Sequence, residues 1–300
     1  MRLNKLFIAS LFLAALSISC NKDDDNSPDV IPDRDRGEQE SEDRAALEEY
    51  LATHFYNYEE FENPGSNFDY AVRLDTIKGA NADKTPLIES DKLQKKTFKY
   101  QDVEYTIYIL HAREGAGEQP KFSDSTFVTY KGELLNGTRF DGSNTPVWFD
   151  AVMTIPGFGQ GLSEFKGATG FEINDDNTIT WENDFGVGTL FIPSGLAYFS
   201  TPRPTIPAYS PLIFSIQMFA VNEADHDGDG IPSYLEDLNG DQILDNDDTD
   251  GDFTPNFMDA DDDGDFTPTR DEIEILEDGT LILTDTNEDG TPDYLDKSTY

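Results

Sequence analysis

The last quarter of the sequence carries carboxylates at a regular spacing. From residue 225 onward there are 26 aspartates and glutamates against two basic residues, in a chain whose formal net charge is -40. Asp225, Asp227 and Asp229 are followed by Gly230 and then by Glu236. Alternate residues of a tight loop place three carboxylates on one side, and the twelfth residue can bind through both oxygens. Calcium is a hard cation that takes six to eight oxygen ligands, so the spacing predicts a calcium-binding loop.

The same pattern recurs and therefore forms an internal repeat. Five units follow one another without room for the flanking helices of an EF-hand, and the tail resembles thrombospondin type 3-like calcium repeats. The expected ligands are Asp225, Asp227, Asp229, Ile231 and Glu236 in unit one; Asp237, Asn239, Asp241, Asp245 and Asp248 in unit two; Asp248, Asp250, Asp252 and Asp259 in unit three; Asp261, Asp263, Asp265 and Glu272 in unit four; and Asp285, Asn287, Asp289, Asp293 and Asp296 in unit five.

Three units depart from the pattern at the sixth position, where glycine favours the turn: Gln242, Phe253 and Phe266 stand there. The alternative interpretation is a disordered acidic tail. Four units share a proline at one position, which argues against disorder: Pro232, Pro255, Pro268 and Pro292. We expect residues 225–300 to fold with bound calcium and to open without it, because the carboxylates then repel one another.

Between Phe127 and Val221 the informative residues are aromatic. The segments read VTYKGELLNGTRFDGS from Val128, FIPSGLAYF from Phe191 and IPAYSPLIFSIQMF from Ile206. Their order resembles the FKBP-type peptidyl-prolyl cis/trans isomerase domain, which has a V-x-Y-x-G strand, an F-D pair, an I-P-x-x-L-A-Y segment, an I-P turn and a final L-x-F strand. The resemblance covers about a third of the chain.

The residues themselves predict an α+β fold. Val128 and Tyr130 alternate with polar neighbours, Asn136-Gly137 indicates a hairpin, and apolar residues alternate along the last strand from Leu212 to near Val221. With one short helix between such strands, the class is α+β. In the resembled family, an antiparallel sheet curls around that helix.

The resemblance implies an aromatic pocket on the concave side of this sheet. Phe158 stands where many family members have a tryptophan floor, Val147 where an aromatic wall is usual, and Phe199 where glycine is usual. The 167–184 segment is an insertion relative to a minimal domain. The implied pocket residues are Tyr130, Phe140, Asp141, Ile155, Phe158, Tyr198, Ile206 and Phe214.

The start of the chain resembles a bacterial lipoprotein signal. Arg2 and Lys5 precede a short apolar run, which ends in small residues directly before Cys20, the only cysteine. Cys20 is therefore the expected lipidation site, and an ordinary secretory signal with a chance cysteine is the alternative. The segment Lys22-Asp23-Asp24-Asp25 resembles the acidic export tag of surface lipoproteins of the Bacteroidetes. We expect a lipid anchor in a bacterial outer membrane.

The remaining residues predict the domain organisation. Leu47, Leu51, Phe55 and Tyr58 form one apolar stripe of a helix from 43 to 60, and alternation at 68–72 and 103–109 predicts strands that extend or cover the isomerase-like sheet. No catalytic triad or dyad can be assembled from three histidines and one cysteine. The expected parts are a signal peptide (1–19), a disordered tether (20–42), an N-terminal extension (43–120), an isomerase-like domain (121–222) and calcium-binding repeats (225–300).

The function expected from these features is cis/trans isomerisation of X-Pro bonds in exported proteins, with no cofactor for catalysis. The partners would be proline-containing polypeptides, the membrane and calcium, whereas the negative charge excludes nucleic acid. Because the repeats begin after the last strand, activity is expected to survive their removal. The alternatives are a non-catalytic module that binds proline segments, and a calcium-dependent protein for surface adhesion or assembly.

Overall fold

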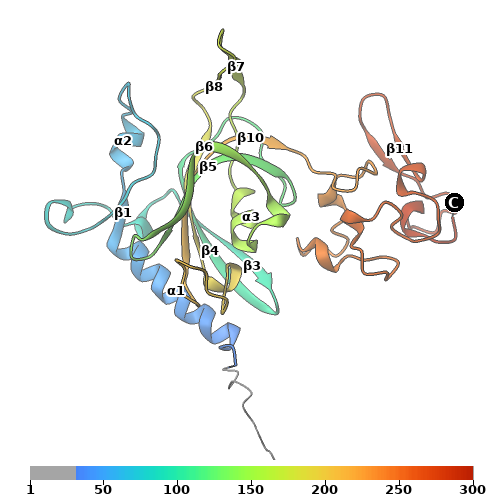
Figure 1. Cartoon of the computed structure of the whole chain (residues 1–300), viewed down its shortest axis with the longest axis horizontal. Coiled ribbons are helices and arrows are strands. Elements are labelled where there is room, and N and C mark those ends of the chain that lie inside the picture. The colour runs from blue at the N-terminus through green and yellow to red at the C-terminus, as the bar shows by residue number, and fades with distance from the viewer. Residues whose placement is uncertain (1–31, 300) are drawn as a thin grey trace, which may run out of the picture. The chain divides into compact units, whose positions relative to one another are not determined.

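The structure is a computed structural model that describes residues 32–299 (Figure 1). It contains antiparallel sheets and few helices, in agreement with the predicted α+β class. Three α-helices are described: α1 (Arg36–Thr53), α2 (Tyr58–Glu62) and α3 (Pro156–Leu162). Among the described residues, none of the helices combines the length and the apolar character that a membrane span requires.

A six-stranded sheet forms the centre of the isomerase-like part, with the strand order β3-β4-β9-β10-β5-β6. Three further two-stranded pairs are β1 with β2, β7 with β8, and β11 with β12. The sheet strands are β3 (Leu93–Tyr100), β4 (Val103–Arg113), β5 (Ser125–Leu134), β6 (Arg139–Asp150), β9 (Gly186–Ile192) and β10 (Leu212–Asn222). The paired short strands are β1 (His54–Tyr56), β2 (Leu74–Thr76), β7 (Phe171–Ile173), β8 (Ile179–Trp181), β11 (Ile273–Ile275) and β12 (Leu281–Leu283).

The predicted hairpin joins β5 to β6. Gly137 in its turn has φ +80°, which glycine adopts without a steric penalty. Pairing then slips by two residues, because Val128 pairs with Val147 whereas Tyr130 pairs with Ser143. This bulge shifts the second half of β6 relative to a regular ladder.

Alternating side chains give the sheet two buried faces. On β4, Ile107 and Ile109 pack with α3, whereas Tyr108 and Leu110 pack with α1 from the opposite face. Helix α3 therefore covers one face of the sheet and α1 covers the other (Figure 1). A strand buried on both faces explains the nearly continuous apolar run in β4.

The predicted disordered tether is wrong from Arg36 onward, because α1 begins there rather than at residue 43. Asp35 caps the helix by accepting a hydrogen bond from the Glu38 amide. The polar composition of 36–42 suggested disorder, but Gln39 is buried and donates to Asp43, which is buried in turn. Cys20 and the expected signal peptide lie outside the described residues.

The segment that follows α1 also differs from the prediction. The helix ends at Thr53, so Phe55 lies in β1 and Tyr58 in α2, although Leu47 and Leu51 are buried as expected. Residues 68–72 form no strand, and Tyr70 has φ +54°. The predicted boundary at residue 120 divides the central sheet, because β3 and β4 belong to it.

Beyond β10 the chain consists mainly of loops and short 3₁₀ helices. Each of four helices begins directly after a proline of the repeat, whose fixed φ suits the start of a helical turn. These helices are Ser233–Leu235, Asn256–Met258, Thr269–Asp271 and Asp293–Leu295. The repeated prolines thus mark a repeated local structure, and the hairpin β11–β12 separates the fourth unit from the fifth.

Candidate functional site: an aromatic cavity and an acidic tail

The eight residues implied by the FKBP resemblance line one cavity of about 760 Å³. They come from β5, β6, β10, α3 and the loops that flank α3 and follow β9. Further residues that line the cavity are Phe149, Met153, Thr154, Arg203, Pro204 and Thr205. This volume lies in the usual range of ligand pockets, and most of the residues that line it are apolar.

Phe158 forms the floor of the cavity at the start of α3. Its ring lies 4.7 Å from that of Phe214, 5.4 Å from that of Phe149 and 6.4 Å from that of Tyr130, measured between centroids. Helix α3 lies close to the sheet, because a Cβ at Gly157 would approach Ile192 Cγ2 to 2.3 Å. Phe158 is buried and fixed by aromatic rings on several sides, so the floor is pre-formed.

Tyr130 and Asp141 supply the polar edge of the cavity. The Tyr130 hydroxyl donates to Asp141 Oδ2 at 2.9 Å, and the Gly142 amide donates to Asp141 Oδ1 at 2.8 Å. Burial and the hydrogen bond to Asp141 raise the pKa of Tyr130 to about 12. The phenol therefore stays protonated at neutral pH and can donate to Asp141.

Tyr198 and Ile206 enter the cavity from the loop after β9, which α1 holds in place. Asp43 on α1 accepts a hydrogen bond from the Ser194 amide at 2.7 Å. Arg36 lies 4.0 Å from the centroid of the Phe199 ring and donates to the Gly195 carbonyl at 3.2 Å. The helix that was predicted as part of a separate extension thus supports two pocket residues.

Phe199 occupies a backbone conformation that disfavours it. Its φ is +46°, a region in which bulky side chains are rare. This explains why glycine is usual at the position in the resembled family. The Phe199 ring packs edge-on against Tyr209 at 5.1 Å and beneath Arg36, and these contacts offset the strain.

Phe149 forms a wall of the cavity that was not predicted from the sequence. Val147 was expected to leave that wall thin, but Val147 is not among the residues that line the cavity. Phe149 lines it instead, with its ring 5.1 Å from Tyr130. The bulge between β5 and β6 moves the aromatic position along the strand, and no sequence signal marks where the two extra residues fall.

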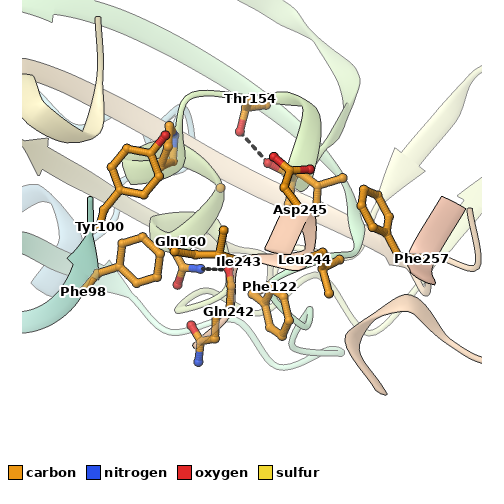
Figure 2. A pocket seen from close by; sticks show the side chains of 14 residues that line it. Phe98, Tyr100, Phe122, Thr154, Gln160, Gln242, Ile243, Leu244, Asp245 and Phe257 are labelled. Atoms are coloured by element: carbon orange, nitrogen blue, oxygen red, sulfur yellow. Dashed lines mark hydrogen bonds between the residues drawn. The ribbon is translucent and has the colours of Figure 1, made fainter. Parts of the chain in front are cut away.

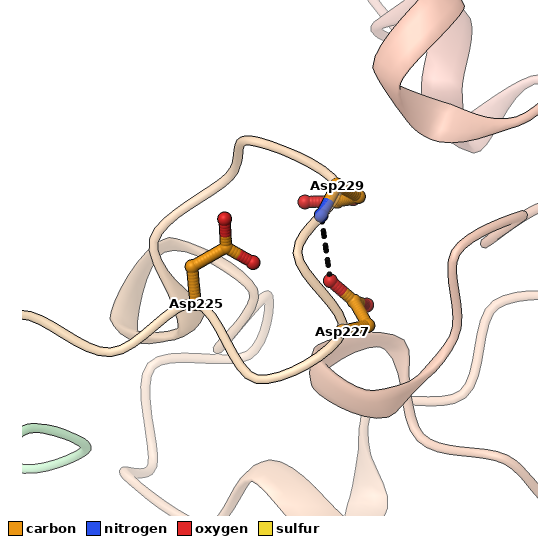
Figure 3. A group of neighbouring side chains, drawn as sticks. All are labelled: Asp225, Asp227 and Asp229. Atoms are coloured by element: carbon orange, nitrogen blue, oxygen red, sulfur yellow. Dashed lines mark hydrogen bonds between the residues drawn. The ribbon is translucent and has the colours of Figure 1, made fainter.

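All five repeat units of the tail adopt the same loop. In every unit the first aspartate accepts a hydrogen bond from the amide of the sixth residue, at 2.9–3.2 Å, and the carboxylate of the fifth residue accepts one from the seventh. The sixth residue has a positive φ throughout, including Gln242, Phe253 and Phe266. Figure 3 shows the first loop, in which Asp225, Asp227 and Asp229 face its interior. The units therefore repeat in structure as well as in sequence.

Several predicted ligands come together, and others do not. Within the described residues, groups with carboxylate oxygens within 4.8 Å of one another are Asp225, Asp227 and Asp229; Asp229, Glu236 and Asp262; Asp237, Asp241 and Asp247; Asp248, Asp250 and Asp252; and Asp261, Asp263 and Asp265. Asp247 joins the second group in place of the predicted Asp245, and Asp262 was not predicted. Asp259, Glu272 and the fifth unit contribute to none of these groups among the described residues. Asn287 of the fifth unit instead donates to Asp296 at 2.8 Å.

Buried carboxylates of the tail have strongly raised pKa values. Burial and the charge of Asp227 raise the pKa of Glu236 to about 10, and burial raises that of Asp262 to about 8. Burial and the charge of Asp263 likewise raise the pKa of Glu272 to about 8. Ionised carboxylates are destabilising in these positions unless a positive charge compensates them.

The tail also contacts the isomerase-like part directly, behind α3. A cavity of about 230 Å³ lies between them. Phe98 and Tyr100 line it from the isomerase-like part, and Ile243 and Leu244 line it from the tail (Figure 2). Ile243 packs against the core that contains Phe158. Closer to β10, the Ala224 amide donates to Asp124 at 3.2 Å, and His226 Nε2 lies 3.1 Å from Asp150 Oδ2.

Comparisons with known proteins show that this chain is similar in sequence to FKBP-type peptidyl-prolyl isomerases. FkpA from Buchnera aphidicola (strain Bp), an FKBP-type peptidyl-prolyl cis-trans isomerase, is 32% identical over 140 residues, which are 45% of this chain and 49% of the relative. FkpA from Escherichia coli K12 is 35% identical over 113 residues, 37% of this chain and 36% of the relative. FkpA from Aeromonas hydrophila is 27% identical over 173 residues, 53% of this chain and 57% of the relative. The chain thus spans less than two thirds of the length of these relatives.

Two solved structures are also similar. A peptidyl-prolyl cis-trans isomerase from Pseudomonas syringae is 24% identical with a TM-score of 0.34, and the match covers 45% of this chain and 84% of that chain. FkpA from Escherichia coli is 28% identical with a TM-score of 0.34, and the match covers 45% and 53% of the two chains.

Residues 226–283 match the family model described as BamM C-terminal. This model is not one of thrombospondin type 3 repeats, so the resemblance of the tail to those repeats rests only on the spacing of its residues. The sequence similarity to FKBP-type peptidyl-prolyl isomerases confirms the predicted resemblance.

Proposed function

We propose that the chain accelerates cis/trans isomerisation of X-Pro bonds in exported polypeptides. The observation that carries this proposal is the cavity above Phe158, which brings together all eight residues that the FKBP resemblance implies. Uncatalysed isomerisation takes tens to hundreds of seconds, which is slow enough to limit folding.

The chemistry needs no nucleophile. The planar amide is resonance-stabilised and charge-separated, whereas the twisted transition state is less polar, so an apolar cavity stabilises the transition state relative to the substrate. Phe158 would carry the proline ring, and Phe140, Phe149 and Phe214 would exclude water from it. Tyr130, Asp141 and Tyr198 would orient the substrate backbone. Their positions around one cavity support these roles.

The test is a coupled proline-isomerisation assay on a panel of X-Pro peptides, with and without calcium. We expect acceleration, with a preference for apolar residues before proline because the cavity walls are apolar. Absence of acceleration by the folded protein would refute the enzyme proposal. If those peptides still bind, the chain acts as a module for proline segments instead.

The second part of the proposal concerns where the protein is located in the cell. The apolar signal that ends at Cys20, followed by the acidic segment, supports a lipid anchor in the bacterial outer membrane and a place in the cell envelope. Several acyl chains on one cysteine anchor a protein stably, whereas one chain does not. Cys20→Ser should move the protein from the membrane fraction to the soluble fraction, and a variant that stays with the membrane contradicts the anchor.

Calcium binding by the tail forms the third part. Five loops with the same hydrogen bonding and several groups of facing carboxylates support it. The affinity expected for extracellular modules is weak, with Kd of order 10⁻⁴–10⁻³ M. Binding to the folded form alone raises its stability. Proteolysis of the tail in calcium and in chelator tests this part, and identical cleavage in both conditions would reject it.

A further inference from the structure

Three buried carboxylates from two distant repeat units face one another. Asp229 and Glu236 belong to the first unit, and Asp262 belongs to the fourth. One oxygen of each lies within 4.8 Å of the other two. The residues are 2%, 0% and 2% exposed, respectively, so water does not solvate the group. Asp262 occupies none of the ligand positions that the loop pattern assigns.

Four oxygens of these three carboxylates have no hydrogen-bond partner among the described residues. Asp229 Oδ2, both carboxylate oxygens of Glu236 and Asp262 Oδ1 are all buried and unpartnered. Buried carboxylates are normally paired with a cation or bound to a metal. A fully buried glutamate with two free oxygens therefore indicates a ligand of positive charge.

Asp262 is held in an orientation that leaves one oxygen free for such a ligand. Thr269 Oγ1 donates to Asp262 Oδ2 at 2.7 Å, and the Asp262 amide donates back to Thr269 Oγ1 at 3.2 Å. Thr269 is itself fully buried. The other carboxylate oxygen, Oδ1, takes no part in this pair and is buried without a partner.

The repeat itself shows that an acid at this position is unusual. Asp262 is the second residue of its unit, and the other four units carry a neutral or weakly basic residue there. These residues are His226, Leu238, Thr249 and Thr286. An acidic residue is thus not needed for the loop, and its presence in the fourth unit calls for a separate role.

We propose that Asp229, Glu236 and Asp262 bind a calcium ion that joins the first repeat unit to the fourth. The donors are all carboxylate oxygens, which suit a hard divalent cation. Asp229 also belongs to the loop group with Asp225 and Asp227, so its carboxylate lies between a cation position inside a loop and one between units. The inter-unit ion closes the 237–261 segment into a loop, and the tail then folds as one body.

This inference deepens the proposed calcium binding of the tail, and it is independent of isomerase activity. Calcium stoichiometry of the whole chain is measured by titration calorimetry for the wild type and for Asp262→Asn, which keeps an acceptor for Thr269. Glu277→Gln is the matched control, because Glu277 is an exposed acid of the same tail outside all the carboxylate groups. Asp225→Asn reports on the first loop, because Asp225 is absent from the inter-unit group.

We expect Asp262→Asn to bind one calcium ion fewer than the wild type and to lose the calcium-dependent protection of 237–261 from protease. Glu277→Gln should match the wild type in both measurements. Asp262→Thr should lose the same ion, and the fold accommodates threonine because units three and five carry it at this position.

Two results would overturn the inference and can be told apart. If the wild type binds calcium and both Asp262 variants bind as much, the inter-unit site is wrong while calcium binding by the loops stands. If the wild type binds no calcium, the proposed calcium binding of the tail fails together with the inter-unit site.

Discussion

The hydroxyl of Tyr130 on β5 donates to the carboxylate of Asp141 on β6 across the mouth of the aromatic cavity, at 2.9 Å. Asp141 pairs with Gly132 in the ladder, so the bond runs diagonally between neighbouring strands. The Gly142 amide fixes the second oxygen of Asp141. One side-chain contact thus ties the edge of the cavity to the hairpin.

The first prediction concerns this hydrogen bond. Tyr130→Phe keeps the ring but removes the donor, and we expect kcat/KM to fall about fivefold, since a hydrogen bond contributes about 1 kcal/mol. Asp141→Asn keeps the shape and removes the charge, so it tests whether the charge itself matters. Both variants should keep the wild-type thermal stability within a few degrees. Unchanged kcat/KM in both variants would show that the pair does not orient the substrate.

The second prediction concerns the floor of the cavity. Phe158→Leu should lower kcat/KM by about tenfold, because water enters beneath the proline ring and the apolar surface shrinks. The matched control is Phe165→Leu, which alters the same core beyond the end of α3 without lining the cavity. Each substitution should cost about 1–3 kcal/mol of stability. Equal losses of activity in the two variants would mean that Phe158 acts only through folding.

The eight pocket residues could be predicted from the sequence, because they lie on strands and turns that leave local patterns in the sequence. The Asn136-Gly137 turn sets the hairpin, and alternation fixes which face Phe214 occupies. Phe149 was missed because a bulge shifts register, and a bulge leaves no mark in the pattern of apolar residues.

Long-range contacts account for the other differences. The polar residues of α1 looked disordered because the partner of Asp43, the Ser194 amide, lies 151 residues away in sequence. Asp262 could not be assigned for the same reason, since its neighbours Asp229 and Glu236 belong to another unit. Spacing within a unit predicts a loop, but it does not predict how units pack on one another.

The third prediction tests whether α1 positions the loop that carries Tyr198. Asp43→Asn weakens the bond to the Ser194 amide, because a neutral amide oxygen is a poorer acceptor than a carboxylate. We expect KM to rise several-fold while kcat changes less, since the loop holds substrate but does not line the floor. Glu49→Gln, an exposed acid on the same helix, is the control. An equal fall in kcat and kcat/KM would argue against a positioning role.

The fourth prediction is a pH dependence of stability that arises from His111. The side chain is buried against Phe165, and burial lowers its pKa below the usual value of about 6.5. The unfolded chain therefore binds more protons than the folded chain just below that pH, so the free energy of unfolding falls as the pH drops through this window.

His111→Gln removes the titrating group and should flatten the dependence below about pH 6.5, by about 1.4 kcal/mol for each unit of pKa difference. The charges that act on His111 are those of Glu114, Glu164 and Lys92, and they remain in the variant. Denaturant unfolding at several pH values measures the effect. Parallel pH profiles for the two proteins would contradict it.

The last prediction concerns the contact between the tail and α3. The tail was expected to be dispensable, but Ile243 packs against the core that holds Phe158, and Gln160 on α3 donates to the Gln242 carbonyl at 3.5 Å. Ile243→Ser should therefore lower the unfolding temperature of the isomerase-like part, because a methyl-rich side chain leaves the core. Leu238→Ser is the matched control in the same repeat unit, since Leu238 is 46% exposed.

We expect the activity to fall in Ile243→Ser and to stay unchanged in Leu238→Ser, as for the unfolding temperature. Loss of Ile243 frees the outer side of α3, so the Phe158 ring samples more positions and kcat/KM falls, whereas Leu238→Ser leaves it unchanged. Added calcium should restore neither the unfolding temperature nor the kcat/KM of Ile243→Ser, because the side chain of Ile243 is not a calcium ligand. If Ile243→Ser and Leu238→Ser behave alike in both unfolding temperature and kcat/KM, the tail does not support α3 and is dispensable for catalysis.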